Sequence, residues 1–265
     1  MYSKFQLALK CLSYYVSASN SRGHGIHSPF VFELITHVMN DKTRYTAYEK
    51  VERLRERLVA DKSMLEVQDF GAGSSLTRSN RRTVSSIAKN AAKPAKFGQL
   101  LYRMVQYYKP KNILELGTSL GITSSYLAMA NPDTDITTLE GADSVASLAL
   151  QNFDRLGINN IQLHRGNFDE SLPAVLKDIK ALDFCFIDGN HRQEPTERYF
   201  RQILPHVKND TILVFDDIHW SRDMEQAWDT ISSHTSVRCT IDLFFIGIVL
   251  FRQEFKEKQH FAIRY

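Results

Sequence analysis

Two acidic residues and two glycines are the residues of this chain best suited to chemistry. An apolar stretch at 113–116 contains Glu115 and runs into Gly117-Thr118-Ser119-Leu120-Gly121, and a second apolar stretch ends in Glu140. Glycines let the backbone turn tightly and approach a ligand closely, and a carboxylate that ends the next strand can accept hydrogen bonds from ribose hydroxyls. These residues predict a site for a cofactor that contains a nucleoside.

The spacing of the glycines indicates which kind of nucleoside cofactor to expect. Dinucleotide-binding loops commonly read G-x-G-x-x-G, whereas Ser119 stands here in place of the middle glycine. A pyrophosphate clamp is therefore disfavoured relative to a cofactor without phosphates. However, Glu140 follows Gly121 by 19 residues, near the spacing of about 20 found in dinucleotide sites. A nicotinamide-dependent oxidoreductase stays open as an alternative.

Acidic and amide residues recur after later apolar stretches. Asn167 and Phe168 follow the third stretch, Asp188 follows the fourth, and Asp216 with Asp217 follow the fifth. Ligands of open α/β sheets bind beyond the carboxyl ends of the strands, so we expect these residues to converge on one cleft. Any one of them alone is equally well explained as a turn or a helix cap, because Asp and Asn favour loops for local reasons.

The elements that must position these residues alternate from residue 94 onward. Such alternation predicts an α/β fold with a doubly wound, mainly parallel sheet. Residues 237–243 and 246–251 predict a closing antiparallel hairpin around Phe244. The other expected strands are 112–116, 135–139, 161–164, 182–187 and 211–215, and the expected helices are 94–108, 122–130, 144–156, 172–179, 197–204 and 222–233.

The first 93 residues are less regular, and we expect a domain boundary after them. Residues 29–39 and 47–60 predict helices, so 1–93 is interpreted as a helical cap and 94–265 as the cofactor-binding domain. His24 and His27 are interpreted as ordinary loop residues. Residues 69–75 imitate a glycine-rich cofactor loop, but polar residues follow instead of a helix.

Composition bounds the class of protein. The chain has 265 residues, 43% of them hydrophobic and 24% charged, with a formal net charge of +3. That charge is too small to imply a polyanionic partner, and composition argues neither for nor against RNA. Nucleic acid is disfavoured because the residues at 188–191, DGNH, differ from the aromatic-flanked polar motif usual in base-modifying enzymes. No apolar run approaches the roughly 20 residues of a membrane helix. Three cysteines without metal-ligand spacing favour a reducing cytoplasm.

The ordered series of motifs over about residues 94 to 252 resembles the class I S-adenosylmethionine (SAM) methyltransferases, a Rossmann-like family. It is most similar to the catechol-type small-molecule O-methyltransferases, whose reversed final strand pair the expected hairpin also resembles. The series as a whole is specific to this family, whereas each motif alone is weak evidence for it. The motifs are KFGQLL at 96–101, LELG at 114–117, LE at 139–140, GNF at 166–168, FIDGNH at 186–191 and VFDD at 214–217.

The resemblance implies a role for each loop. It places Glu140 on the cofactor ribose, the Gly117 turn beside the methionine part, and Asn167 or Phe168 beside the adenine. The cofactor-binding residues predicted in this way are Glu115, Gly117, Ser119, Gly121, Glu140, Asn167, Phe168 and Asp188.

The resemblance also implies residues that bind a metal ion and a residue that acts as general base. In metal-dependent members, acids matching Asp188 and an acid–amide pair matching Asp216 and Asp217 hold Mg²⁺, and Asp217 here replaces the amide. His191 stands where a lysine commonly takes the substrate proton, and its ordinary pKa of about 6.5 suits a general base. We therefore predict His191 and Asp188 as catalytic residues, with His219 as the second choice of base. Helix capping, or pairing of His191 with a nearby acid, would explain the same residues.

Three classes of function follow. The first is SAM-dependent O-methylation of a small hydroxylated molecule, with or without metal assistance. The second is a nucleic-acid or protein methyltransferase that uses the basic N-terminal region around Arg78, Arg81 and Arg82. The third is the nicotinamide oxidoreductase. We expect a small-molecule acceptor and no membrane, and assembly as a homodimer stays open.

Overall fold

The computed structural model describes residues 1–19, 28–67, 81–91 and 94–265. They form two compact units: a central unit, Pro29–Ser171, and a terminal unit made of Met1–Ser28 with Leu172–Tyr265. The expected boundary at residue 93 therefore stays a prediction about domain organisation, since these units are divided differently. His24, His27, Arg78 and the loop 69–75 lie outside the described residues.

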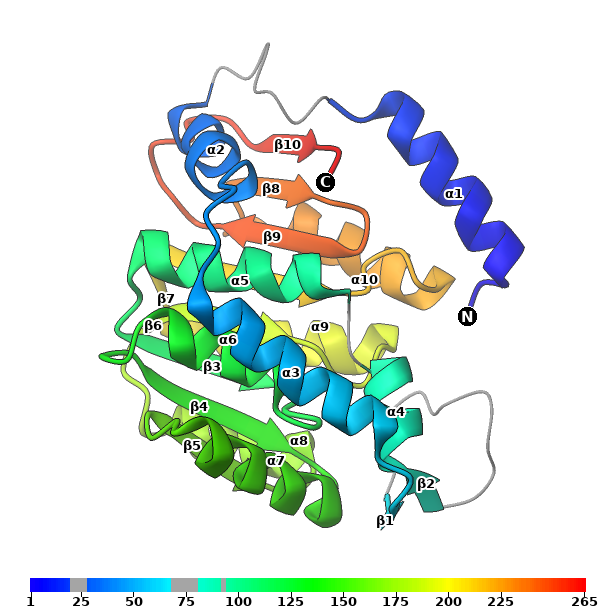
Figure 1. The fold of residues 1–265 in the computed structure, drawn as a ribbon. Coiled ribbons are helices and arrows are strands. Elements are labelled where there is room, and N and C mark those ends of the chain that lie inside the picture. The colour runs from blue at the N-terminus through cyan, green and yellow to red at the C-terminus, as the bar shows by residue number, and fades with distance from the viewer. Residues whose placement is uncertain (20–27, 68–80, 92–93) are drawn as a thin grey trace. The chain divides into compact units, whose positions relative to one another are not determined.

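Three parallel strands form the sheet of the central unit. They are β3 (Asn112–Leu116), β4 (Asp135–Glu140) and β5 (Ile161–Arg165), paired in the order β3-β4-β5. The pairing sets Leu116 beside Leu139 and Glu140 beside Arg165, so the three carboxyl ends lie at one edge. The strands alternate with α5 (Ala95–Tyr108), α6 (Ile122–Ala130) and α7 (Asp143–Leu156), as Figure 1 shows.

The helices between residues 29 and 91 form part of the core of the central unit. They are α2 (Pro29–Glu33), the π-helix η1 (Leu34–Met39), α3 (Thr46–Ala60) and α4 (Val84–Ala91), next to a small antiparallel pair of β1 (Met64–Glu66) and β2 (Arg81–Thr83). The helices predicted at 29–39 and 47–60 are thus confirmed. Helix α3 buries Val51, Leu54 and Leu58 in the same cluster as Tyr126 of α6. Burial of this apolar face stabilises α3 on α6.

The terminal unit contains β6 (Leu182–Ile187), β7 (Val207–Asp216), β8 (Cys239–Asp242), β9 (Ile246–Leu250) and β10 (Gln259–Ala262). Their order is β10-β8-β9-β7-β6. Strands β6 and β7 are parallel, and β9 runs antiparallel to β7 and β8, which confirms the predicted hairpin. Phe244 in its turn has φ 70°. The helices are α9 (Gln193–Ile203), the short η2 (Leu204–His206) and α10 (Arg222–Ser233).

Helix α8 (Phe168–Leu176) begins earlier than the predicted 172–179. The prediction of its start was wrong because Asn167 begins the helix. The side-chain oxygen of Asn167 accepts the amide of Asp169 at 3.1 Å, which satisfies one of the open amides of the first turn.

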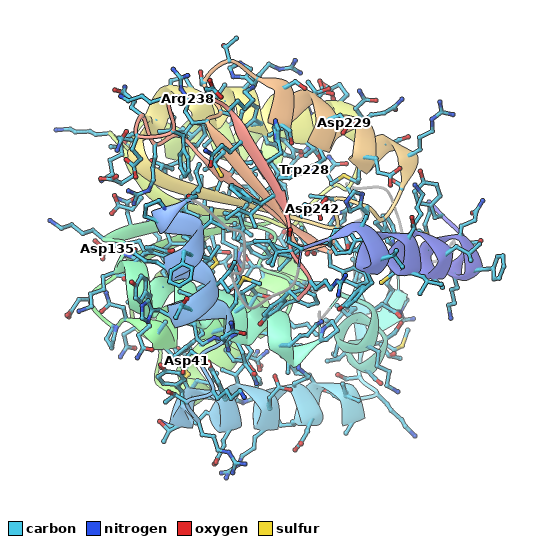
Figure 2. The ribbon with its side chains drawn as sticks, turned by 90° about the horizontal axis from the view of Figure 1, so that it is seen from above. Asp41, Asp135, Trp228, Asp229, Arg238 and Asp242 are labelled. Carbon is cyan, nitrogen blue, oxygen red and sulfur yellow. The ribbon has the colours of Figure 1, made fainter. Side chains whose placement is uncertain are left out.

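Two elements of the terminal unit were not expected, namely strand β10, which pairs in parallel with β8, and helix α1 (Lys4–Ser17). Ser3 and Gln6 form a capping box at the start of α1. The Tyr14 hydroxyl lies 2.7 Å from the backbone oxygens of both Asp242 and Ile263. Asp242 lies near the C-terminal end of α1 in Figure 2. Contacts with the far end of the chain therefore fix this helix.

Candidate active site

The loop that follows β3 is built on backbone hydrogen bonds to β4. The amides of Gly117 and Thr118 donate to the Leu139 carbonyl at 3.0 and 3.1 Å. The amide of Ser119 donates to the Glu140 carboxylate at 2.8 Å. A phosphate clamp needs such amides to point at the ligand. Because these three amides are used inside the protein, the loop suits a cofactor without phosphates.

Left-handed backbone at three positions shapes the same loop. Gly117 has φ 105°, Ser119 φ 48° and Gly121 φ 80°. A Cβ atom on Gly121 would lie 2.5 Å from the ring of Phe153, so glycine is required there for space as well as for conformation. Ser119 holds a conformation that is uncommon for a residue with a side chain, and such positions concentrate at functional sites.

Glu140 joins the first two loops. One oxygen accepts the Ser119 amide, and the other accepts the amide of Ala142 at 2.9 Å. A carboxylate offers about four acceptor positions, and one at a strand end beside a glycine loop is suited to hydroxyl donors. The predicted proximity of Glu140 to the Gly117 turn is observed, and its contact with a ribose stays a prediction.

Glu115 lies deeper than expected for a cofactor ligand. Its side chain is fully buried and accepts from Ser124 at 2.5 Å and from Thr138 at 2.6 Å. Thr138 also exchanges a hydrogen bond of 2.7 Å with Thr118 in the glycine loop. This burial favours Glu115 as a positioning residue for the loop. The polar Thr138 within an apolar strand was the available sequence signal for the network, because buried hydroxyls need partners.

The loop after β5 lies against the same edge. The amide of Gly166 donates to the Glu140 carbonyl at 2.9 Å. Asn167 and Phe168 follow, both partly buried. The predicted cofactor residues of the central unit therefore follow three neighbouring strand ends, as the alternation predicted. Asp188 is the one predicted cofactor residue that belongs to the terminal unit.

In the terminal unit, the predicted base and its acid lie together. The Nε2 atom of His191 is 3.3 Å from Oδ1 of Asp188, and both side chains are about one-fifth exposed. The His191 ring meets the edge of Trp220 at 5.7 Å between centroids. Trp220 comes from the loop after β7, so loops that follow two neighbouring strands hold His191.

Residues with a left-handed backbone conformation also occur in the two loops that follow β6 and β7. Asn190 has φ 68°, His191 φ 39° and Asp217 φ 57°. The Asn190 amide nitrogen lies 3.1 Å from the Tyr199 hydroxyl, and the Asp217 backbone amide donates to the Phe245 carbonyl at 2.7 Å. Consecutive strained residues persist only where surrounding contacts hold them, which is typical of functional loops.

The three predicted metal ligands differ in surroundings. Asp216 is buried at the end of β7, whereas Asp188 and Asp217 are partly exposed. In the part of the chain that the structure describes, no three His, Cys, Asp or Glu side chains are placed to hold one ion. The side chains in this arrangement do not fit a Mg²⁺ site, so we derive no step through Mg²⁺ and their metal role stays a prediction.

His219, the second choice of base, is held between two carboxylates. Its Nε2 lies 2.7 Å from Asp242, and its Nδ1 lies 3.2 Å from Glu225. Burial lowers the pKa of His219, but the hydrogen bonds and charges of Asp242 and Glu225 outweigh burial and raise it. Lys10 and Tyr2 of the N-terminal segment bind Glu225 from the other side. A histidine engaged at both ring nitrogens suits a structural role better than proton transfer.

Comparison with known proteins agrees with this arrangement. A family of methyltransferase domains matches residues 114–218. A catechol O-methyltransferase of Niastella koreensis is 32% identical over 124 residues, which cover 46% of this chain and 55% of that protein. The chain thus matches about half the length of this curated relative.

Solved structures extend the likeness to most of the chain. An O-methyltransferase of Bacillus cereus in complex with SAH has a TM-score of 0.56 at 19% identity, over 79% of this chain and 92% of that one. An SAH-bound methyltransferase of Podospora anserina has a TM-score of 0.58 at 14% identity, over 95% and 98%. The predicted Rossmann-like class, mainly parallel with a closing hairpin, is confirmed. Residues 114–218 therefore match a family of methyltransferase domains, and the chain has the fold of these solved methyltransferases.

Proposed function

We propose that the chain transfers a methyl group from SAM to a hydroxyl of a small molecule. The observation that carries the proposal is a set of hydrogen bonds in the glycine loop. The Ser119 amide donates to Glu140, and the amides of Gly117 and Thr118 donate to the Leu139 carbonyl. This arrangement leaves a carboxylate for ribose hydroxyls and builds no phosphate clamp, which disfavours the nicotinamide alternative. The SAH-bound relatives support the choice of cofactor.

Methyl transfer requires little covalent chemistry from the protein itself. When bound, SAM supplies a methyl group that is already activated. The acceptor oxygen forms a bond to the methyl carbon as the bond from sulfur to that carbon breaks, and the hydroxyl proton goes to a base. We assign that base to His191: its Nε2 faces Asp188, so Nδ1 takes the proton and the Asp188 carboxylate stabilises the charged ring.

The acceptor class follows from the same chemistry. A hydroxyl whose proton a histidine can remove near neutral pH must be fairly acidic, and phenolic hydroxyls satisfy this better than alcohols. The relative from Niastella koreensis is named for catechol. We therefore propose an aromatic diol as the acceptor, and catechol is the probe.

The cofactor proposal is tested by calorimetric titration with SAM, S-adenosylhomocysteine and NAD. We expect the first two to bind and NAD to fail. Glu140→Gln should weaken S-adenosylhomocysteine by about tenfold or more, because a charged acceptor of the ribose hydroxyls is lost. The matched control Glu170→Gln changes an exposed residue of α8 and should bind normally. Binding of NAD alone would overturn the proposal.

Treatment with a chelator tests whether Mg²⁺ assists the methyl transfer. Loss of turnover that returns on addition of Mg²⁺ would establish metal assistance. Turnover that is insensitive to the chelator would exclude a metal role for Asp188, Asp216 and Asp217.

The proposed location is a reducing cytoplasm, which the free thiols of Cys11, Cys185 and Cys239 support. In the described residues, no helix is long and apolar enough to cross a membrane.

A further inference from the structure

A basic hollow lies in the central unit between α3 and α7. Its volume is about 360 Å³, within the range of small-molecule pockets. Helix α3 supplies three cations and α7 supplies a fourth, while two leucines give it an apolar wall. The lining residues are Lys50, Arg53, Leu54, Arg57, Arg155 and Leu156.

Two of these guanidinium groups converge on one neutral oxygen. Nη2 of Arg57 lies 3.2 Å from Oδ1 of Asn152, and Nη1 of Arg155 lies 3.4 Å from the same atom. Burial and then the charge of Arg155 lower the pKa of Arg57, as expected for two like charges held close together. Both arginine side chains are exposed, so solvent screens much of this repulsion, and a bound anion would neutralise what is left of it.

Among the residues that the structure describes, neither Arg57 nor Arg155 forms an ion pair with Asp or Glu. The charge of Asp61 raises the pKa of Arg57, and the pKa of Asp61 is lowered by its hydrogen bonds with Ser63 and then by the charges of Arg57 and Arg155. Asp61 thus faces both guanidinium groups beyond ion-pair distance and accepts the Ser63 amide at 2.8 Å. Arg53 pairs with Glu49 at 3.4 Å, where both side chains are exposed and the interaction is weak.

The wall of the hollow is fixed before any ligand arrives. Asn152 is fully buried and donates its amide to the Leu120 carbonyl at 3.0 Å, which directs its oxygen to the two arginines. Leu54 is 4% exposed, so the apolar wall is part of the packed core. A buried amide that holds two guanidinium groups side by side is suited to the forked geometry of phosphate oxygens.

We propose that this hollow binds a small molecule with at least two phosphate groups next to an apolar group, such as a nucleoside diphosphate. The phosphates would bind Arg57, Arg155, Lys50 and Arg53, and the apolar part would lie on the leucines. The ligand is a small molecule rather than RNA, because the cations line one hollow and the chain as a whole carries only +3. The proposed transfer reaction does not use this site.

The test is calorimetric titration of the full chain with pyrophosphate and with uridine diphosphate. Pyrophosphate contains neither ribose nor adenine, so its binding does not report on the proposed SAM site. Uridine diphosphate contains a ribose, so its binding is assigned to the hollow only where variants of the hollow weaken it. We expect both to bind, the nucleotide more tightly, with affinity that falls as salt rises. The double variant Arg57→Gln/Arg155→Gln should lose about tenfold or more in affinity for both probes. Arg44→Gln, an exposed residue outside the hollow, is the matched control and should bind normally.

A third variant guards against misfolding of the double variant. Lys50 is exposed, so Lys50→Gln leaves the core intact and should still weaken both probes. The proposal fails if the wild type binds neither probe with a Kd of about 1 mM or tighter. It also fails if Arg44→Gln weakens binding as much as the variants in the hollow. Tighter binding of a single-stranded RNA oligomer, lost in the same variants, would replace it with an RNA surface.

Discussion

At the scale of single residues, His191 carries the proposed proton transfer. Its geometry combines a carboxylate partner, an aromatic neighbour and a strained backbone. Each feature alone has a structural explanation. Their combination on loops that follow two neighbouring strands is the reason to prefer His191 over His219, whose ring nitrogens both face carboxylates.

Replacement of His191 by alanine separates proton transfer from cofactor binding. We expect turnover with catechol to fall by about 10²-fold or more, the scale of a lost general base, with the affinity for S-adenosylhomocysteine unchanged. Initial rates of S-adenosylhomocysteine formation measure the first quantity and calorimetry the second. His37→Ala is the matched control, because His37 is exposed on η1 and stacks only on Tyr107 in the described structure. An unchanged rate in His191→Ala would exclude it as the base.

At the scale of elements, the glycine loop depends on the packing of α7. Gly121 and Gly157 both have positive φ, at 80° and 68°. They differ in space: a Cβ atom at Gly121 would lie 2.5 Å from the Phe153 ring, and nothing lies within 4 Å of one at Gly157. The two positions therefore form a natural pair for separating backbone strain from steric clash.

Gly121→Ala should lower the free energy of unfolding by more than Gly157→Ala does. Strain from positive φ costs about 1–3 kcal/mol at either position, and forcing a methyl group against Phe153 adds roughly 1–3 kcal/mol. Urea unfolding measures both values. Equal losses in the two variants would show that Phe153 moves aside freely. The affinity for S-adenosylhomocysteine should fall only in Gly121→Ala, since Gly157 caps the C-terminal end of α7 and belongs to none of the predicted cofactor loops.

At the scale of the whole molecule, α1 and the C-terminal part of the chain stabilise each other in the terminal unit. Glu225 of α10 accepts from Lys10 at 2.9 Å and from the Tyr2 hydroxyl at 2.5 Å, and it also faces His219. Asp242 faces His219 from β8, and Phe244 stacks on the imidazole ring. Burial raises the pKa of Glu225, but the hydrogen bonds from Tyr2, Lys10 and His219 lower it overall.

This network predicts a pH-dependent stability. Because the pKa of His219 is raised above its ordinary 6.5, its contribution is fully present below pH 6.5 and is lost as pH rises through the raised value. Glu225 has a lowered pKa, so its contribution is present above its ordinary 4.5 and is lost as pH falls through the lowered value. The window of greatest stabilisation by the pair therefore lies between these two ordinary values.

Urea unfolding of His219→Gln and of the wild type tests this prediction. The difference in the free energy of unfolding should be largest between about pH 5 and 6 and should shrink as the pH is raised to about 9. His37→Gln, on the exposed face of η1 and outside this network, is the matched control. A loss in His219→Gln that is constant over the whole range would show that the ring acts by packing alone.

Much of the wound sheet was predictable because its pattern is local. Strands 112–116 and 182–187 and helices 122–130 and 222–233 were predicted with the observed bounds, since apolar runs and periodic faces end at Gly, Pro or capping residues. The site loops were predictable for the same reason: they begin where those strands end. The missed start of α8 shows how one local hydrogen bond, from the Asp169 amide to Asn167, can move a boundary.

The sequence by itself determined the order of strands and helices, the glycine turn and the acids at the strand ends, because each depends on neighbours within a few residues. Only the tertiary structure revealed that Glu115 is buried beneath the loop, that α1 contacts β8 through Tyr14, and that Arg57 and Arg155 share one oxygen of Asn152. Arg57 and Asn152 are 95 residues apart, and Tyr14 and Asp242 are 228 apart. Contacts over such separations leave no periodic signal in the chain, since they form only when distant elements pack.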